Sequence, residues 1–480
     1  MSNKLLSSFS WSALEQGTVK LVQLIVQIAL ARILAPEAFG VLAILLVLIN
    51  IADIIAQSGL GTALIQDQKA TSESYSTAFW LSLMVALVLY AVLFVCAPFI
   101  ASFYTMDNLD IYMRVLAIVL FLNSASSIFR SNLHKDLHFK TLFTCSMSAS
   151  LLSGVVGIGA ALAGLNIWAL VLQVLTQSLV SFAYLLIKTP NRPHVCFRVS
   201  EARKLFSYGW KICLTGVLNA SYTSVSELII GKVSPHADLG YYSQGRKWPI
   251  AVIAAGSNAI SNVLFPAFSK IKDNQDELVA AIKKTITVGT YVLAPFSFLM
   301  IAIAEPLVVV LMTEKWLPCV PVFQMVCIPY CVLMLELASF RAYMALGDSG
   351  LYLKLHVIKI SVGIVLITAT ALLSRNIYVI AFVTALFELF TIIVIELQPA
   401  QRMFGFGRLQ QLKCAFPAIL IGIVALVASL GVSLIIVSYL LKLIVGIVVY
   451  IVVFTGLSAI FKPIGFLEII SLAKIVFRRQ

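Results

Sequence analysis

The stretch ARILAPEAFG covers residues 31–40, and GKVSPHADLG at residues 231–240 repeats its pattern. Each copy has a basic residue and an aliphatic residue before a proline, then an alanine, and Phe or Leu before the final glycine. Each copy also follows a polar-striped helical segment and precedes another long apolar run. Six predicted spans separate the copies, so both run in the same direction. This predicts parallel repeats related by an axis along the membrane normal.

The apolar runs around these copies are long enough to cross a membrane, which takes about 20 residues for about 30 Å of hydrocarbon. Of the 480 residues, 61% are hydrophobic and 11% are charged, whereas soluble proteins have about 45–50% and about 25%. We therefore predict an all-α polytopic membrane protein of about 14 transmembrane helices. The runs cover residues 11–31, 41–63, 77–101, 113–131, 141–164, 167–187, 208–231, 242–265, 285–303, 322–345, 351–374, 377–396, 415–437 and 440–461.

The basic residues orient this map. With the N-terminus in the cytoplasm, about three quarters of the 34 Lys and Arg residues fall in the short connections on the inner side. This bias predicts an even number of spans and both termini in the cytoplasm. The net charge of +13 is then explained by basic residues in the loops between the spans. We therefore expect no nucleic-acid partner.

Catalytic and cofactor motifs are missing from the sequence. It has no GxxxxGK[ST], HExxH or GxSxG pattern, so nucleotide-driven, metalloprotease and serine-hydrolase chemistry have no support. None of the 8 cysteines forms a CxxC pair, and free cysteines usually pack as small buried side chains. We expect no enzyme activity, no cofactor and no metal site.

Polar side chains instead line single faces of several spans. In the first span Gln16, Lys20, Gln23 and Gln27 follow i, i+4, i+7, i+11 spacing, which places them on one narrow face. The predicted substrate-binding cavity consists of these four residues together with Asn50, Asp53, Gln57, Asn123, Arg130, Lys211, Asn219, Tyr222, Ser226, Arg246, Lys247 and Asn258.

Charged side chains in the middle of a bilayer cost about 2.5–3.5 kcal/mol each and persist where they face water or a partner. A cationic cavity would attract an anionic group, and amides and hydroxyls would form hydrogen bonds with neutral polar groups. The competing interpretation is interhelical packing, since amides also join helices. Asp53 could pair with Lys20, and Arg130 could extend to the membrane surface. A membrane carboxylate could carry a proton, and the candidates are Asp53, Glu227 and Glu336.

Eight motifs in the chain form a recognisable series. They are LARILAPEAFG (30–40), SGLGTALIQ (58–66), RSNLHKDLHFK (130–140), IWALVLQ (167–173), LIIGKVSPHADLGYYSQ (228–244), VLFPAFSKIKD (263–273), MTEKWLPCVPVFQ (312–324) and MALGDSGLYLK (344–354). Together they cover roughly residues 1–400 in register and resemble the polysaccharide transporter family, within the superfamily of multidrug, oligosaccharidyl-lipid and polysaccharide exporters. The resemblance implies a location in the bacterial inner membrane. Where members often carry Asp and Asn in the seventh span, this chain has Ser226 and Glu227.

The resemblance implies two six-helix lobes, residues 1–200 and 201–400, around a central cavity, with two additional helices and a cytoplasmic tail in residues 401–480. It implies a monomeric flippase that moves undecaprenyl-diphosphate-linked oligosaccharide units for O-antigen, capsule or exopolysaccharide by alternating access. A polymerase and a chain-length regulator are the expected partners, beside membrane lipids. The first alternative is a cation-coupled drug or metabolite antiporter of the same superfamily, and the second is a membrane-embedded polysaccharide polymerase or ligase.

Overall fold

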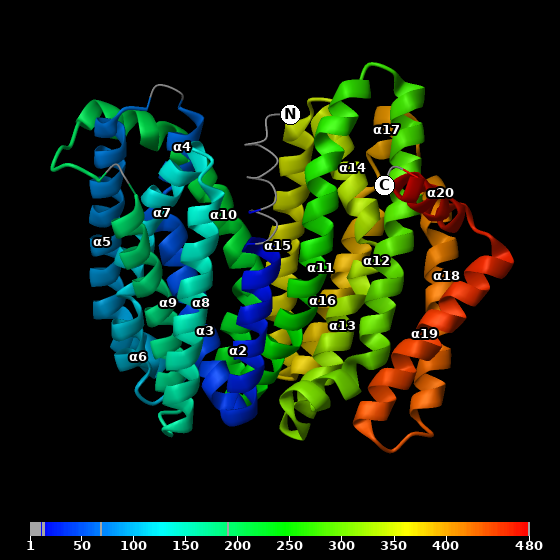
Figure 1. The fold of residues 1–480 in the computed structure, drawn as a ribbon, viewed down its shortest axis with the longest axis horizontal. Coiled ribbons are helices and arrows are strands. Elements are labelled where there is room, and N and C mark those ends of the chain that lie inside the picture. Colours follow the sequence, from blue (N-terminus) through cyan, green and yellow to red (C-terminus); the bar gives the residue numbers. More distant parts are fainter. Residues whose placement is uncertain (1–10, 12–14, 68–69, 190–191, 479–480) are drawn as a thin grey trace. The chain divides into compact units, whose positions relative to one another are not determined.

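The protein is described by a computed structural model that covers residues 11, 15–67, 70–189 and 192–478. This part of the chain is helical and contains no strand. The helices form two compact units, Met1–Gly240 and Tyr241–Gln480, and Figure 1 colours them along the sequence. The all-α prediction is confirmed.

Among its described residues the first unit contains ten helical segments and the first turn of an eleventh, α11. They are η1 (Glu15–Val19), α2 (Lys20–Ile33), α3 (Pro36–Gln57), α4 (Leu60–Gln66), α5 (Ser72–Tyr104), α6 (Leu109–Leu116), α7 (Val119–Lys135), α8 (Phe139–Leu162), α9 (Ile167–Lys188) and α10 (Val199–Val233).

The second unit contains the rest of α11 and all later helices. They are α11 (His236–Ile271), α12 (Gln275–Met312), η2 (Glu314–Cys319), α13 (Val320–Tyr330), α14 (Leu333–Ala345), α15 (Ser349–Ser374), α16 (Ile377–Phe390), η3 (Thr391–Glu396), α17 (Ala400–Phe404), α18 (Arg408–Ser433), α19 (Tyr439–Phe461) and α20 (Ile464–Arg478).

Ten helices in the described part of the chain are long and apolar enough to cross a membrane, and a bent pair would make an eleventh. The pair is Glu314–Tyr330 with Leu333–Ala345, bent by 43°. A polytopic membrane protein is therefore confirmed, while the count of fourteen stays a prediction. Two of the remaining predicted runs, 208–231 and 242–265, lie in the long helices α10 and α11. A third, 11–31, lies partly in η1 and α2 and partly outside the described residues.

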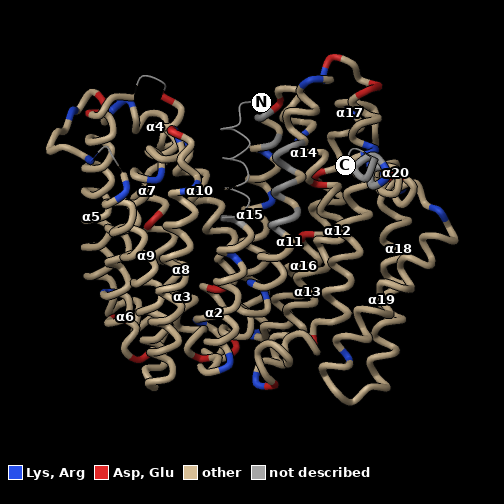
Figure 2. Tube along the Cα trace, in the orientation of Figure 1, with Lys and Arg blue, Asp and Glu red and all other residues tan. Residues whose placement is uncertain are grey.

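The outer surfaces suit a lipid environment. In the most apolar part of α5 only 11% of the residues are buried inside the protein, and in α19 the share is 17%. Large side chains such as Phe99, Val155 and Val427 are exposed, which in water would be an aggregation liability. Figure 2 shows that most charged residues of each unit lie near the ends of its helices. Helices satisfy their own backbone groups and can therefore present such faces to lipid.

The two copies of the repeat are in direct contact. A Cβ atom on Gly40 would collide with the carbonyl oxygen of His236, and a Cβ on Gly240 would collide with the carbonyl oxygen of Pro36. Each glycine thus meets the first-turn residue of the opposite copy, four positions before that copy's glycine. Pro36 suits the first turn of α3 because it needs no backbone N–H there. The contact is reciprocal, as expected for two related segments around a local twofold axis.

A second glycine contact joins the other end of α3 to α10. The helix ends at Ser58, which takes the left-handed conformation, and Gly59 follows with φ +65°. A Cβ on Gly59 would lie 2.7 Å from the carbonyl oxygen of Gly209 on α10. Helix α10 therefore packs against α3 within the first unit, although we assigned its residues to the second lobe from the sequence. The lobe boundaries remain a prediction.

We predict that Gly40→Ala and Gly240→Ala destabilise the protein. The added methyl meets a backbone carbonyl, which cannot rotate away as a side chain can, so the cost should be about 1–3 kcal/mol as for overpacked cores. The measurement is the midpoint of thermal unfolding in detergent, followed by size-exclusion chromatography.

Gly456→Ala on α19 is the matched control, because no atom lies within 4 Å of a Cβ at that position. It should leave the midpoint unchanged or raise it, since alanine favours a helix. Equal midpoints for all three variants would contradict the close glycine contact.

Candidate functional site

A cavity of about 700 Å³ lies within the first unit. Its walls come from α3, α4, α7, α9 and α10. Polar side chains of α3, α4, α7 and α9 face it, with residues of α10 on the remaining side. Polar and apolar residues share this lining about equally, and placed polar groups in a ligand site fix the orientation of the ligand.

Asp53 links two walls of this cavity. Its Oδ2 atom accepts hydrogen bonds from Gln57 Nε2 at 3.0 Å and from Asn123 Nδ2 at 3.2 Å. Gln57 lies one turn further along α3, and Asn123 lies on α7. The other carboxylate oxygen, Oδ1, is buried and has no hydrogen-bond partner in the described part of the chain. Asp53 therefore joins α3 to α7 through amides, and the predicted pairing with Lys20 is not among its contacts.

Arg130 brings a positive charge to the cavity wall. It follows Asn123 and Ser127 on one face of α7, as the sequence spacing predicts. Its recorded hydrogen bond runs from Nη2 to the Cys145 sulfur at a long 3.9 Å. Among the described residues no carboxylate forms an ion pair with it. The guanidinium is thus available to an anion in the cavity, which it could hold through paired hydrogen bonds.

Five of the predicted cavity residues meet in this one place. Asn50, Asp53, Gln57, Asn123 and Arg130 all line it. The two stripes that predicted them, on α3 and α7, therefore face each other. Their role in binding stays a prediction.

The predicted first-span residues lie elsewhere. Gln23 on α2 donates to Ser150 on α8 at 3.4 Å, which fits the packing interpretation. Lys20 is exposed, and the side chain of Gln16 lies outside the described residues. Gln27 is half-buried and interacts with neighbouring groups.

Helix α10 contributes a different face from the one predicted. Ile212, Cys213 and Gly216 line the cavity, while Lys211 and Asn219 are exposed. Its predicted residues Tyr222, Ser226 and Glu227 are not part of the lining either. Arg246 and Lys247 belong to the second unit, and the side chain of Asn258 lies outside the described residues.

Helix α9 supplies cavity residues that we did not predict. Gln177, Ser178 and Ser181 line the wall, and the two serines are buried. A signal was present in the sequence, because Gln173, Gln177 and Ser181 are spaced by four residues and share one helical face. We overlooked it because none of these residues is charged.

The second unit contains a cluster of buried charges around Lys359 on α15. Its Nζ lies 2.8 Å from Glu388, 3.1 Å from Glu396 and 3.5 Å from Glu336. The lysine side chain is 7% exposed and that of Glu396 is 1% exposed. Of these residues, we predicted Glu336 alone as an ionic site.

The geometry leaves this cluster short of positive charge. Glu336 and Glu396 share one lysine, and Glu396 approaches it without the alignment of a hydrogen bond. A buried and a half-buried carboxylate beside one ammonium, with Glu388 closer still to it, disfavour full ionisation. Glu396 ends the π-helical segment η3, a distortion that often marks functional positions. The cluster can therefore hold a proton or another cation.

The sequence of the chain matches a known family and several of its relatives. Residues 29–321 match the model of a family described as polysaccharide biosynthesis protein. The chain is 27% identical over 307 residues to the succinoglycan biosynthesis transport protein ExoT of Rhizobium meliloti (strain 1021), covering 64% of this chain and 62% of that protein. It is 22% identical over 334 residues to the lipopolysaccharide biosynthesis protein WzxC of Escherichia coli (strain K12), covering 68% and 67%.

Solved structures share the fold. The lipid II flippase MurJ, in an inward closed conformation, matches with a TM-score of 0.70 at 11% identity, over 94% of this chain and 99% of that chain. A multidrug resistance MATE family transporter, in an inward-facing conformation, matches with a TM-score of 0.60 at 15% identity, over 79% and 94%. At these identities the likeness concerns the fold alone.

We predict that Lys359→Ala destabilises the protein by about 3–5 kcal/mol, because it leaves buried carboxylates without their cation. Adding Glu396→Gln to this variant should recover part of the loss. The readout is thermal unfolding in detergent.

Lys354→Ala on the same helix is the control, since Lys354 is exposed. If Lys359→Ala and Lys354→Ala unfold at the same temperature, Lys359 does not stabilise the cluster.

Proposed function

The chain belongs to the polysaccharide biosynthesis protein family, and we propose that it is a flippase that moves a lipid-linked oligosaccharide across the membrane. The observation that carries this proposal is the cavity in which Arg130 has no carboxylate partner among the described residues. A guanidinium binds phosphate oxygens through paired hydrogen bonds. The amides and hydroxyls around it can bind the sugars.

The proposed substrate is an undecaprenyl-diphosphate-linked repeat unit of O-antigen, capsule or exopolysaccharide. A diphosphate needs a cation in a membrane span, and sugars need neutral hydrogen-bonding groups. Gln57 and Asn123 hold the Oδ2 of Asp53, and among the described residues this carboxylate forms no ion pair with Arg130, so the guanidinium stays available to the diphosphate. The lipid tail would stay in the bilayer while the headgroup crosses.

The wider arrangement follows from the sequence. We propose about fourteen spans, with lobes 1–200 and 201–400 that alternate access to a central cavity, and 401–480 as two additional helices and a tail. Both termini would lie in the cytoplasm and the protein in the bacterial inner membrane. It would act as a monomer without enzymatic chemistry, beside a polymerase and a chain-length regulator.

Glu336 is the best-supported site for coupling to a cation gradient. It shares Lys359 with Glu396 inside the second unit, so uptake of one proton would relieve the repulsion between the two carboxylates. Asp53 is the second candidate, because its Oδ1 atom is buried without a hydrogen bond. Glu227 has interactions with neighbours and is the weakest of the three.

We predict that Arg130→Gln impairs export while the protein still inserts. Losing hydrogen bonds to a charged partner costs about 1.5–3 kcal/mol, which corresponds to about 10- to 100-fold in binding. The measurement is surface polysaccharide in a deletion strain that carries the variant, with lipid-linked units assayed on each leaflet.

Accumulation on the cytoplasmic leaflet is expected for a lost flippase, whereas accumulation on the outer leaflet would indicate a polymerase. Lys188→Gln removes the same charge from an exposed position and should export normally. Drug sensitivity of the deletion strain with normal polysaccharide would favour the antiporter alternative.

A separate prediction concerns coupling. Glu336→Gln should remove the dependence of transport on an imposed proton gradient, because an amide cannot exchange a proton. Flipping of a labelled lipid-linked oligosaccharide would be measured in proteoliposomes, with Glu314→Gln, at an exposed position, as the control. Unchanged gradient dependence in Glu336→Gln would remove Glu336 from this role.

A further inference from the structure

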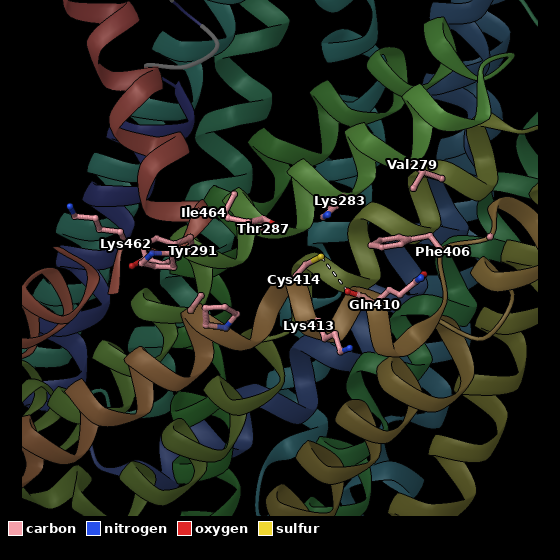
Figure 3. A pocket seen from close by; sticks show the side chains of 15 residues that line it. Val279, Lys283, Thr287, Tyr291, Phe406, Gln410, Lys413, Cys414, Lys462 and Ile464 are labelled. Atoms are coloured by element: carbon pink, nitrogen blue, oxygen red, sulfur yellow. Dashed lines mark hydrogen bonds between the residues drawn. The ribbon is translucent and has the colours of Figure 1, made fainter. Parts of the chain in front are cut away.

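A second cavity, of about 630 Å³, lies within the second unit and has no part in the proposed transport cavity. Its walls come from α12, α18, the start of α20 and the connections before α18 and α20. Figure 3 shows the side chains of Lys283, Lys413 and Gln410 near the centre of the view, with Tyr291 and Lys462 at the left. The cavity therefore brings together segments that are far apart in the sequence.

Three lysines make this cavity cationic. Lys283, Lys413 and Lys462 all line it, and no ion pair is recorded for any of them within the described residues. The adjacent Lys284 does have a partner, because its Nζ lies 2.8 Å from Glu468. Glu468 of α20 therefore pairs with a lysine that does not line the cavity. No Asp or Glu belongs to the lining itself.

The remaining lining is largely apolar. Tyr291, Phe406 and Ala418 are buried, and Pro417 is half-buried beside them. The Tyr291 hydroxyl is engaged with Ser458 of α19, so the ring presents carbon to the cavity. A ligand that fits both parts has an anionic group attached to hydrocarbon.

The position of the cavity indicates which kind of anionic, hydrocarbon-bearing ligand it can bind. Lys413 lies near the start of α18, and Lys462 is the C-terminal cap of α19. These are ends of candidate spans, where lysines reach the headgroup region of a bilayer. Exposed Phe416, Phe461 and Ile464 lie close by in the sequence, so the cavity borders a lipid-facing surface. In the proposed topology this is the cytoplasmic leaflet, whose anionic lipids attract such basic groups.

We propose that this cavity binds one anionic phospholipid, with its phosphate near Lys283 and Lys413 and its upper acyl chains against Tyr291 and Pro417. A phosphodiester supplies the negative charge that the lining lacks. Helix α12 already packs on α18 and on α20, and the bound lipid adds a further link among the three helices. This role is independent of the transported substrate.

The chain contains a reporter for occupancy. Cys414 lines the cavity and is half-buried, and its thiol contacts the Gln410 carbonyl oxygen at 3.2 Å, as Figure 3 shows. A lipid in the cavity should shield this thiol from a small maleimide. Cys196, half-buried in a loop of the first unit, serves as the internal control, and peptide mapping separates the two.

The experiment reconstitutes the full chain in phosphatidylcholine nanodiscs, with or without phosphatidylglycerol or cardiolipin. The anionic lipids should slow the alkylation of Cys414 several-fold and leave Cys196 unchanged. Native mass spectrometry should show an anionic phospholipid that stays bound. Each lysine near an anionic headgroup contributes about fivefold to affinity, so Lys283→Gln with Lys413→Gln should weaken retention about 25-fold.

The matched control is Lys270→Gln with Lys272→Gln, which removes the same charge from exposed positions in the same unit and should retain the lipid. Equal retention by the two double variants, or equal alkylation of Cys414 in all lipids, overturns the proposal. Protection by inorganic phosphate alone, or preferential protection by an isoprenyl diphosphate in phosphatidylcholine, also overturns the assignment to a phospholipid. Size-exclusion profiles confirm that the variants are folded before labelling.

Discussion

The close approach of α3 to α10 and to the first turn of α11 is the constraint on which the first unit depends. Gly40 and Gly240 each meet a backbone carbonyl of the opposite repeat copy, and Gly59 meets Gly209 at the other end of α3. Backbone surfaces in contact leave no room for a methyl group at these positions. Small residues permit this approach in membranes, where helices associate through packing more than through water exclusion. The cavity follows, because α10 then forms its apolar wall.

The two units stabilise their buried charged side chains in different ways. In the first unit, Asp53 is held by two amides and leaves the charge of Arg130 to the cavity. In the second unit, Lys359 is surrounded by carboxylates. Since isolated charges are expensive in a span, the first arrangement suits an anionic ligand and the second suits uptake of a cation. Transport of an anionic lipid driven by a cation gradient would use both.

The helices beyond the two predicted lobes have a different relation to the membrane. Helix α18 packs on α12 and α19, and the lysines at their ends border a cavity rather than an acidic partner. A lipid bound there would stabilise this part of the second unit without entering the transport cavity. Lipid composition would then affect the stability of the protein separately from its substrate.

The sequence by itself determined the class of protein. Apolar runs and the spacing of polar residues are local properties, so they predicted the helices, the membrane environment and the facing stripes of Asn50, Asp53 and Asn123. The two ten-residue copies of the repeat also prove to be the place where α3 and α11 touch. Only spans whose polar face carries a charged residue were predicted to line the cavity. Lys211 was therefore predicted, and Gln177, on an uncharged face, was missed.

The tertiary structure decided which faces meet. Whether a polar stripe lines a cavity, as on α7, or packs against another helix, as Gln23 does on α2, depends on the neighbour it receives. The sequence placed Lys359 and Glu396 in separate spans, and packing alone brought them within 3.1 Å. Periodicity fixes the direction of a side chain relative to its own helix. Its partner is fixed by long-range contacts between helices, which the pattern within one helix does not contain.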